Sequence, residues 1–154
     1  MRDLYGLPKA HLHVHLESTV RWPTLREIGA AGGVPVPERG GALFGGFDGF
    51  FAQNDLVRAC LRRAADFRRI AAEFCADEVA QGTRYAEVSF SAAAHGERLG
   101  DLEMPLLAVL EGLAEGQAAH GIECRLILDH SRRRPVERAW RTLALAERHA
   151  ADGV

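Results

Sequence analysis

Between Lys9 and Glu17 the sequence reads KAHLHVHLE, with histidine at every second position of its central part. In an extended strand successive side chains point to opposite faces, so residues two apart share one face. The segment therefore predicts a β-strand with three imidazoles on one face and three apolar side chains on the other. The imidazole face would hold His11, His13 and His15, and the apolar face Leu12, Val14 and Leu16.

This strand also predicts a metal site. Imidazole is a common ligand for zinc and its neighbours, and two ligands on one rigid strand are already correctly spaced. A lone histidine in an alternating pattern is usually a polar surface residue or a hydrogen-bonded core residue. Three histidines that alternate with apolar residues and lead to Glu17 favour metal ligation instead. One strand supplies only part of a ligand set, so the other ligands are expected elsewhere.

The rest of the chain alternates between helical and strand patterns. Strands are predicted over residues 9–16, 83–90 and 122–128, helices over 23–31, 48–54, 66–81, 105–120 and 135–151, and loops over 34–46 and 91–103. Such alternation is typical of a parallel sheet with right-handed crossovers. Three strands do not close a barrel, and the last helix leads into no strand. We therefore expect residues 1–154 to form a single partial domain, the front of something longer.

Three aromatic residues follow the glycine-rich loop predicted over residues 34–46. Phe47, Phe50 and Phe51 fall at positions i, i+3 and i+4, which puts them on one helical stripe. Such stripes usually belong to the core. The glycines on either side leave open a second interpretation, in which the stripe forms a mobile lid over a site.

Composition limits the classes of partner. The formal net charge is -2, which gives no reason to expect nucleic acid or an anionic membrane as partner. No segment has the pattern of a signal peptide or a transmembrane helix, so we expect a cytoplasmic protein. Cys60, Cys75 and Cys124 are far apart and form no CxxC motif. Two of them lie in apolar helical or strand contexts, which predicts small buried thiols in a reducing compartment.

Two segments resemble a known family. Residues 7–17 (LPKAHLHVHLE) closely resemble the opening motif of the adenosine deaminase family of the amidohydrolase superfamily, and residues 84–91 (RYAEVSFS) resemble its second strand. The resemblance implies an α/β fold, the N-terminal part of a TIM (β/α)₈ barrel with extra helices after strand one. It also implies hydrolysis of an exocyclic amine from a purine by an enzyme that uses one zinc ion.

The resemblance assigns roles to the first strand. It implies that His13 and His15 are the two zinc ligands of strand one, in agreement with barrel active sites lying at the carboxyl ends of strands. His11 lies deeper, and its expected place is either beside the metal or behind its ligands. Glu17 matches an acidic residue that contacts the sugar of a nucleoside, and its alternative role is a helix-side charge.

Further positions match the walls of the family's substrate pocket. Phe47, Phe50 and Phe51 match the apolar lid over the purine, and Ser91 matches a position at the end of strand two. Asp129 and His130, at the end of strand three, are candidates for the pocket lining. The general acid and the other zinc ligands are expected beyond Val154, so the catalytic residues are unknown and the 154-residue segment alone is expected to be inactive.

The substrate is left open because pocket-edge positions depart from the family pattern. Ser18 stands where glycine is usual, Ser89 where arginine is common, and Ala92 where proline is common. The main hypothesis is conversion of adenosine to inosine plus ammonia by the parent enzyme. A related deaminase could act on adenine, AMP or aminodeoxyfutalosine. A third hypothesis is a truncated, non-catalytic binding module.

Overall fold

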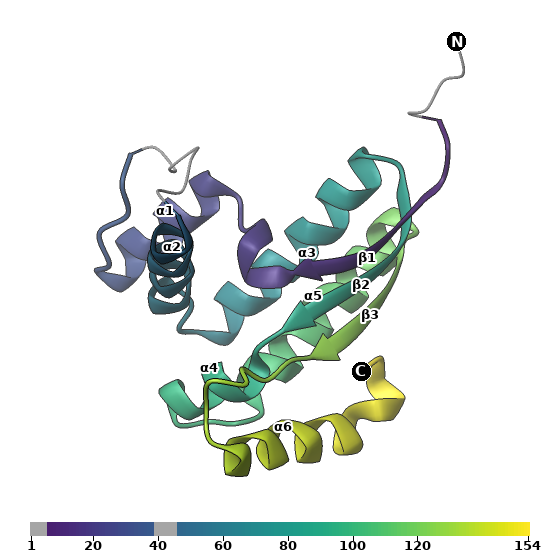
Figure 1. Ribbon diagram of the computed structural model, residues 1–154. Helices are drawn as coiled ribbons and strands as arrows, with labels where there is room; N and C mark the ends of the chain where they lie inside the picture. The colour runs from purple at the N-terminus through teal and green to yellow at the C-terminus, as the bar shows by residue number, and fades with distance from the viewer. Residues whose placement is uncertain (1–5, 39–45) are drawn as a thin grey trace.

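The computed structural model describes residues 6–38 and 46–154. Its elements are β1 (Lys9–His15), η1 (Leu16–Thr19), α1 (Trp22–Gly32), α2 (Phe47–Cys60), α3 (Ala64–Ala80), β2 (Thr83–Phe90), α4 (Ala92–Leu99), α5 (Met104–His120), β3 (Glu123–Leu128), α6 (Val136–His149) and η2 (Ala150–Asp152). The strands form one parallel sheet in the order β1-β2-β3. Figure 1 shows α3 and α5 along one face of the sheet and α1 and α2 beyond the end of β1.

One face of the sheet is buried and the other is open. On β2, Ala86, Val88 and Phe90 are buried and face the helix layer. Their parallel partners on β3 include Cys124 and Leu126, which are buried on the same side. The alternate positions of both strands are partly or fully exposed. The chain therefore builds one covered layer and leaves the opposite sheet face available for other groups.

The helix layer depends on two glycines of α5. A Cβ atom at Gly112 would overlap the carbonyl oxygen of Arg68 on α3, and one at Gly116 would lie 2.5 Å from the Cβ of Cys75. The missing side chains let the two helices approach closely. Beneath them the Sγ atoms of Cys75 and Cys124 are 3.8 Å apart. All three cysteines are buried and free, whereas the sequence predicts burial for two of them.

The predicted strands are confirmed within two residues, but two helices differ from the prediction. The helix predicted to end at Asn54 continues to Cys60 as α2. The segment predicted as a loop over residues 91–103 contains α4, a helix of only eight residues that includes a glycine. Its burial against the core stabilises it. In the loop predicted over residues 34–46, residues 39–45 lie outside the described part.

The prediction of strict alternation in β1 is wrong at its start. His11 pairs with Ala86 and Val14 with Val88, so three steps along β1 match two steps along β2. This register shift places His11 on the helix-covered face, with Val14, and leaves Leu12 58% exposed. The cause is Glu78 of α3, a buried carboxylate that lies 3.0 Å from His11 and needs a polar partner there.

Within the two described ranges, no helix is both long enough and apolar enough to cross a membrane.

Candidate functional site at the carboxyl ends of the strands

The carboxyl ends of the three strands border a cavity of about 700 Å³. His15 ends β1, Ser91 follows β2 and Asp129 follows β3, and all three line the cavity. Glu17 of η1 and Phe50 of α2 line it as well. The parallel topology thus gathers residues that are more than a hundred positions apart at one edge of the sheet, where parallel α/β folds form their sites.

Two of the three alternating histidines lie together on the open face. The ring centroids of His13 and His15 are 5.5 Å apart, with an interplanar angle of 57°. Both residues are exposed, so their nitrogens are accessible. Asp129 Oδ2 lies 3.3 Å from His15 Nδ1. A carboxylate at Nδ1 leaves Nε2 as the nitrogen that can bind a metal, an arrangement common around zinc.

The donor set fits part of a zinc site. Imidazole nitrogens are normal zinc ligands, and His13 and His15 provide two of them on adjacent exposed positions. A zinc site needs further protein ligands or water. Among residues 6–38 and 46–154, no group of three or more His, Cys, Asp or Glu side chains is arranged to hold a metal ion. His11 is excluded from this pair because it lies on the other face with Glu78.

The ends of β2 and β3 are joined by a hydrogen bond. The Ser91 hydroxyl donates to Asp129 Oδ1 at 2.5 Å, while the other carboxylate oxygen faces His15. Asp129 therefore links all three strand ends at the cavity. His130, its neighbour, also lines the cavity, and its Nε2 is buried without a hydrogen-bond partner in the described structure.

Glu17 lines the cavity although its side chain is only 6% exposed. Its Oε1 accepts a hydrogen bond from the backbone N–H of Ser91 at 3.3 Å and lies 3.2 Å from His95 Nε2. The His95 side chain on α4 is fully buried. Sequence reasoning missed His95 because it lies in the segment that was predicted to be a loop. The only available signal was a histidine within a stretch of small residues.

Two residues of the aromatic stripe of α2 face the cavity. Phe50 and Phe51 both line it, and their rings make an edge-to-face contact at 5.9 Å. The guanidinium of Arg133 lies 5.7 Å from the centroid of Phe51. The side chain of Phe47, the third member of the stripe, lies outside the part that the structure describes. Of the three residues predicted to form the lid, the structure therefore places Phe50 and Phe51 at the cavity.

Charges of both signs surround the cavity. Its acidic side chains include Glu17, Asp55 and Asp129, and its basic ones are Arg58 and residues 132–134, all arginine. The acidic groups lie at the strand ends and on α2, whereas three of the four arginines share the loop before α6. The site thus offers hydrogen-bond acceptors near the histidines and cationic groups at its rim.

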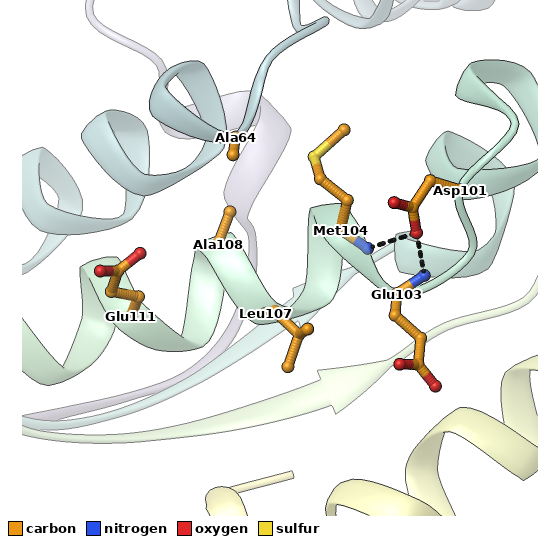
Figure 2. Close-up of a pocket in the computed structure, with 7 residues that line it drawn as sticks. All are labelled: Ala64, Asp101, Glu103, Met104, Leu107, Ala108 and Glu111. Atoms are coloured by element: carbon orange, nitrogen blue, oxygen red, sulfur yellow. Dashed lines mark hydrogen bonds between the residues drawn. The ribbon is translucent and has the colours of Figure 1, made fainter.

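A second hollow, of about 550 Å³, lies on the outer layer between the starts of α3 and α5. Figure 2 shows its lining, in which Asp101 accepts hydrogen bonds from the backbone N–H groups of Glu103 and Met104. This carboxylate therefore caps α5. The hollow contains no histidine or cysteine and lies on the helix side of the sheet, so we do not consider it a site for chemistry.

Comparison with known proteins identifies relatives of this chain. Residues 8–154 match the family model described as Adenosine deaminase. An adenine deaminase of Streptomyces coelicolor is 32% identical, and the match covers 93% of this chain and 44% of that protein. The chain spans about half the length of the curated relatives that it matches.

Solved structures of deaminases and amidohydrolases have the same fold as this chain. An amidohydrolase from Burkholderia ambifaria with bound zinc is 26% identical, with a TM-score of 0.80 over 97% of this chain and 43% of that one. Arabidopsis ADAL, solved with GMP, is 26% identical with a TM-score of 0.81, covering 97% of this chain and 48% of that one. These matches confirm the predicted fold, the N-terminal part of a TIM barrel.

Proposed function

Because this chain belongs to the adenosine deaminase family, we propose that the protein of which it forms part removes an amino group from a purine nucleoside by hydrolysis, converting adenosine to inosine and ammonia. The observation that carries the proposal is the pair of neighbouring exposed imidazoles of His13 and His15, of which His15 lines the cavity. Around this pair, the cavity supplies acceptors for a sugar and aromatic rings for a base.

We assign His13 and His15 as two ligands of one zinc ion. Bound zinc supplies activation of water as a nucleophile at neutral pH. The protein's contribution is orientation: Asp129 holds Nδ1 of His15, so Nε2 points away from the carboxylate. The zinc-containing relative from Burkholderia ambifaria supports this assignment. The remaining ligands and the general acid would come from the part of the barrel that follows residue 154.

The substrate would lie between the strand ends and α2. We propose that Glu17 accepts a hydrogen bond from a sugar hydroxyl and that Phe50 and Phe51 cover the purine ring. Ser91 contributes indirectly, since its hydroxyl fixes Asp129 and its backbone N–H binds Glu17. Burial of the base against aromatic side chains excludes water from the reacting carbon.

Two alternative substrates have specific support. The Streptomyces coelicolor relative is named an adenine deaminase, which favours the free base. The arginines at residues 58 and 132–134 on the cavity rim favour a phosphate and hence AMP. Against AMP stands Glu17, whose carboxylate would repel a phosphate at the sugar end. Aminodeoxyfutalosine is a fourth candidate, and no feature of the described residues favours it over the others.

The test is ammonia release by the full-length protein from adenosine, adenine, AMP and aminodeoxyfutalosine. We expect the highest kcat/KM with adenosine, and a loss of at least about a thousandfold in the His13→Ala variant. His120→Ala, at an exposed helix end, is the control and should retain full activity. Ammonia release only from adenine or only from AMP would show that this compound, and not adenosine, is the substrate. No release from any of them would favour the binding-module hypothesis.

The 154-residue chain alone should release no ammonia in the same assay. It carries two zinc ligands of strand one, which bind the metal weakly without the others. Activity of this chain by itself would contradict the assignment of the general acid to a later part of the barrel.

A further inference from the structure

A buried polar chain runs behind Glu17. His95 Nε2 lies 3.2 Å from Glu17 Oε1, and His95 Nδ1 lies 3.4 Å from Arg98 Nη2. Arg98 also donates to the carbonyl oxygen of Leu61. The three side chains come from η1 and α4, which are separated by more than seventy residues. Their order places a carboxylate at the cavity, an imidazole behind it and a guanidinium behind that.

The aromatic surroundings hold the imidazole in one orientation. The ring of His95 stacks on Phe90, with centroids 5.4 Å apart and an interplanar angle of 19°. Phe67 contacts it edge-on at 5.0 Å. The His95 side chain has no solvent exposure. It therefore cannot exchange its protein contacts for water without local opening of the core.

The neighbours of the imidazole determine where its proton lies. A guanidinium has only donors, so Nδ1 of His95 must be the acceptor toward Arg98. The ring proton is then on Nε2, which donates to Glu17 Oε1. Burial lowers the pKa of His95, which agrees with a neutral ring carrying one proton. The tautomer follows from this geometry.

The hydrogen bonds divide the two oxygens of Glu17 into distinct roles. Oε1 receives both protein donors, the backbone N–H of Ser91 and the imidazole of His95. Oε2 accepts no hydrogen bond from the part of the chain that the structure describes, and Glu17 lines the cavity. A carboxylate held by two donors at one oxygen presents the other in a fixed direction.

We propose that His95 is a positioning residue that sets substrate preference: it fixes the carboxylate of Glu17 so that Oε2 accepts a hydrogen bond from a ribose hydroxyl. The inference rests on the proposed function, which places a nucleoside in this cavity, and adds a residue and a reason for preferring nucleosides to free bases. Arg98 acts one step further away, because it selects the tautomer of His95 that donates.

Two substitutions of His95 separate the effect of its hydrogen-bond donor from the effect of its packing in the core. Gln at position 95 keeps an N–H donor at the reach of Nε2, whereas Met fills a similar volume and donates nothing. In the full-length protein we expect His95→Met to raise KM for adenosine about tenfold with kcat changed less than twofold. His95→Gln should stay within about threefold of the unmodified protein. A change in KM at constant kcat is the sign of lost uniform binding.

Substrate analogues then locate the contact. For adenine, which has no sugar, His95→Met should leave KM unchanged. Among 2′-, 3′- and 5′-deoxyadenosine, the analogue that lacks the contacted hydroxyl should lose its sensitivity to the substitution. An equal rise in KM for adenosine and adenine, or a loss in kcat with constant KM, would overturn the proposal, because both indicate general damage to the fold.

A measurement without turnover keeps the inference separate from the proposed function. In ¹⁵N-histidine-labelled full-length protein, His95 should show the Nε2-protonated tautomer, and Arg98→Met should increase the Nδ1-protonated form. The resonance is identified by its loss in His95→Gln. An Nδ1-protonated ring in the unmodified protein would refute the inference even if adenosine is deaminated. If His95 is protonated at Nε2 but the protein deaminates none of the substrates, the hydrogen bond from His95 to Glu17 is supported and the proposed function is refuted.

Discussion

His11 Nδ1 lies 3.0 Å from Glu78 Oε1, across the interface between β1 and α3. This pair fixes the first of the alternating histidines to the helix layer, where Glu78 is buried. His13 and His15 remain together on the open face. The sequence motif therefore contains two kinds of histidine, one that satisfies a buried carboxylate and two that face the candidate metal site.

This division predicts different effects on metal content. In the full-length protein, His13→Ala and His15→Ala should each lower zinc affinity by at least about a hundredfold, because each removes a ligand. His11→Ala should leave the zinc content unchanged and instead reduce stability by about 1–3 kcal/mol, since it leaves Glu78 without its partner. Zinc per protein after dialysis against a chelator checks both results. Equal zinc loss in all three variants would contradict the division.

Asp129 should influence the metal without touching it. Replacing its carboxylate in Asp129→Asn weakens the acceptor at His15 Nδ1, so zinc affinity should fall by about tenfold to a hundredfold. Competition with a fluorescent chelator measures the affinity. Asp55→Asn, on the α2 side of the same cavity, is the matched control and should retain the original value.

His95 predicts a dependence of stability on pH. Burial lowers the pKa of His95 below its unfolded value of about 6.5, so below that pH the unfolded chain binds a proton that the folded chain resists. Stability should be fully present above about pH 6.5 and fall as the pH drops toward the lowered pKa. Urea unfolding at pH 7.5 and 5.5 gives the difference. In His95→Gln this difference should be smaller, and an identical loss in both proteins would exclude the contribution.

Two glycines offer a matched pair for helix packing. At Gly112 a Cβ would meet the backbone of Arg68, so Gly112→Ala should destabilise the protein by about 1–3 kcal/mol despite the higher helix propensity of alanine. At Gly32 in α1, the nearest atom to an added Cβ is Arg62 Cδ at 3.8 Å. Gly32→Ala should therefore stabilise by up to about 1 kcal/mol. Urea midpoints compare the two.

The sequence predicted the parts that depend on local pattern. Three strands and their alternation with helices follow from periodicity and parallel topology. The place of Ser91 near the pocket came from the resemblance to the deaminase family. Periodicity predicts the parallel α/β sheet, and the resemblance identified this sheet as the N-terminal part of a barrel. The prediction was weaker wherever a residue far along the chain decided the outcome.

Two features depended on such distant partners. The face of His11 is decided by Glu78, which lies 67 positions away, and alternation alone gives the wrong answer. The helix α4 forms because Ala92, Ala93 and His95 are buried by elements elsewhere in the chain. The helix is only eight residues long and contains a glycine, so neither the helix nor its role behind Glu17 was predicted from the sequence.

The register shift in β1 has a consequence for changes in chain length. The extra residue of β1 lies between His11 and Val14, so deletion of Leu12 would remove this shift while His13 and His15 keep their face. Deletion of Val14 would instead turn His13 toward the helix layer. Leu12 is therefore a position where a deletion leaves the proposed metal-facing pair intact, and length variants among homologous sequences should concentrate there.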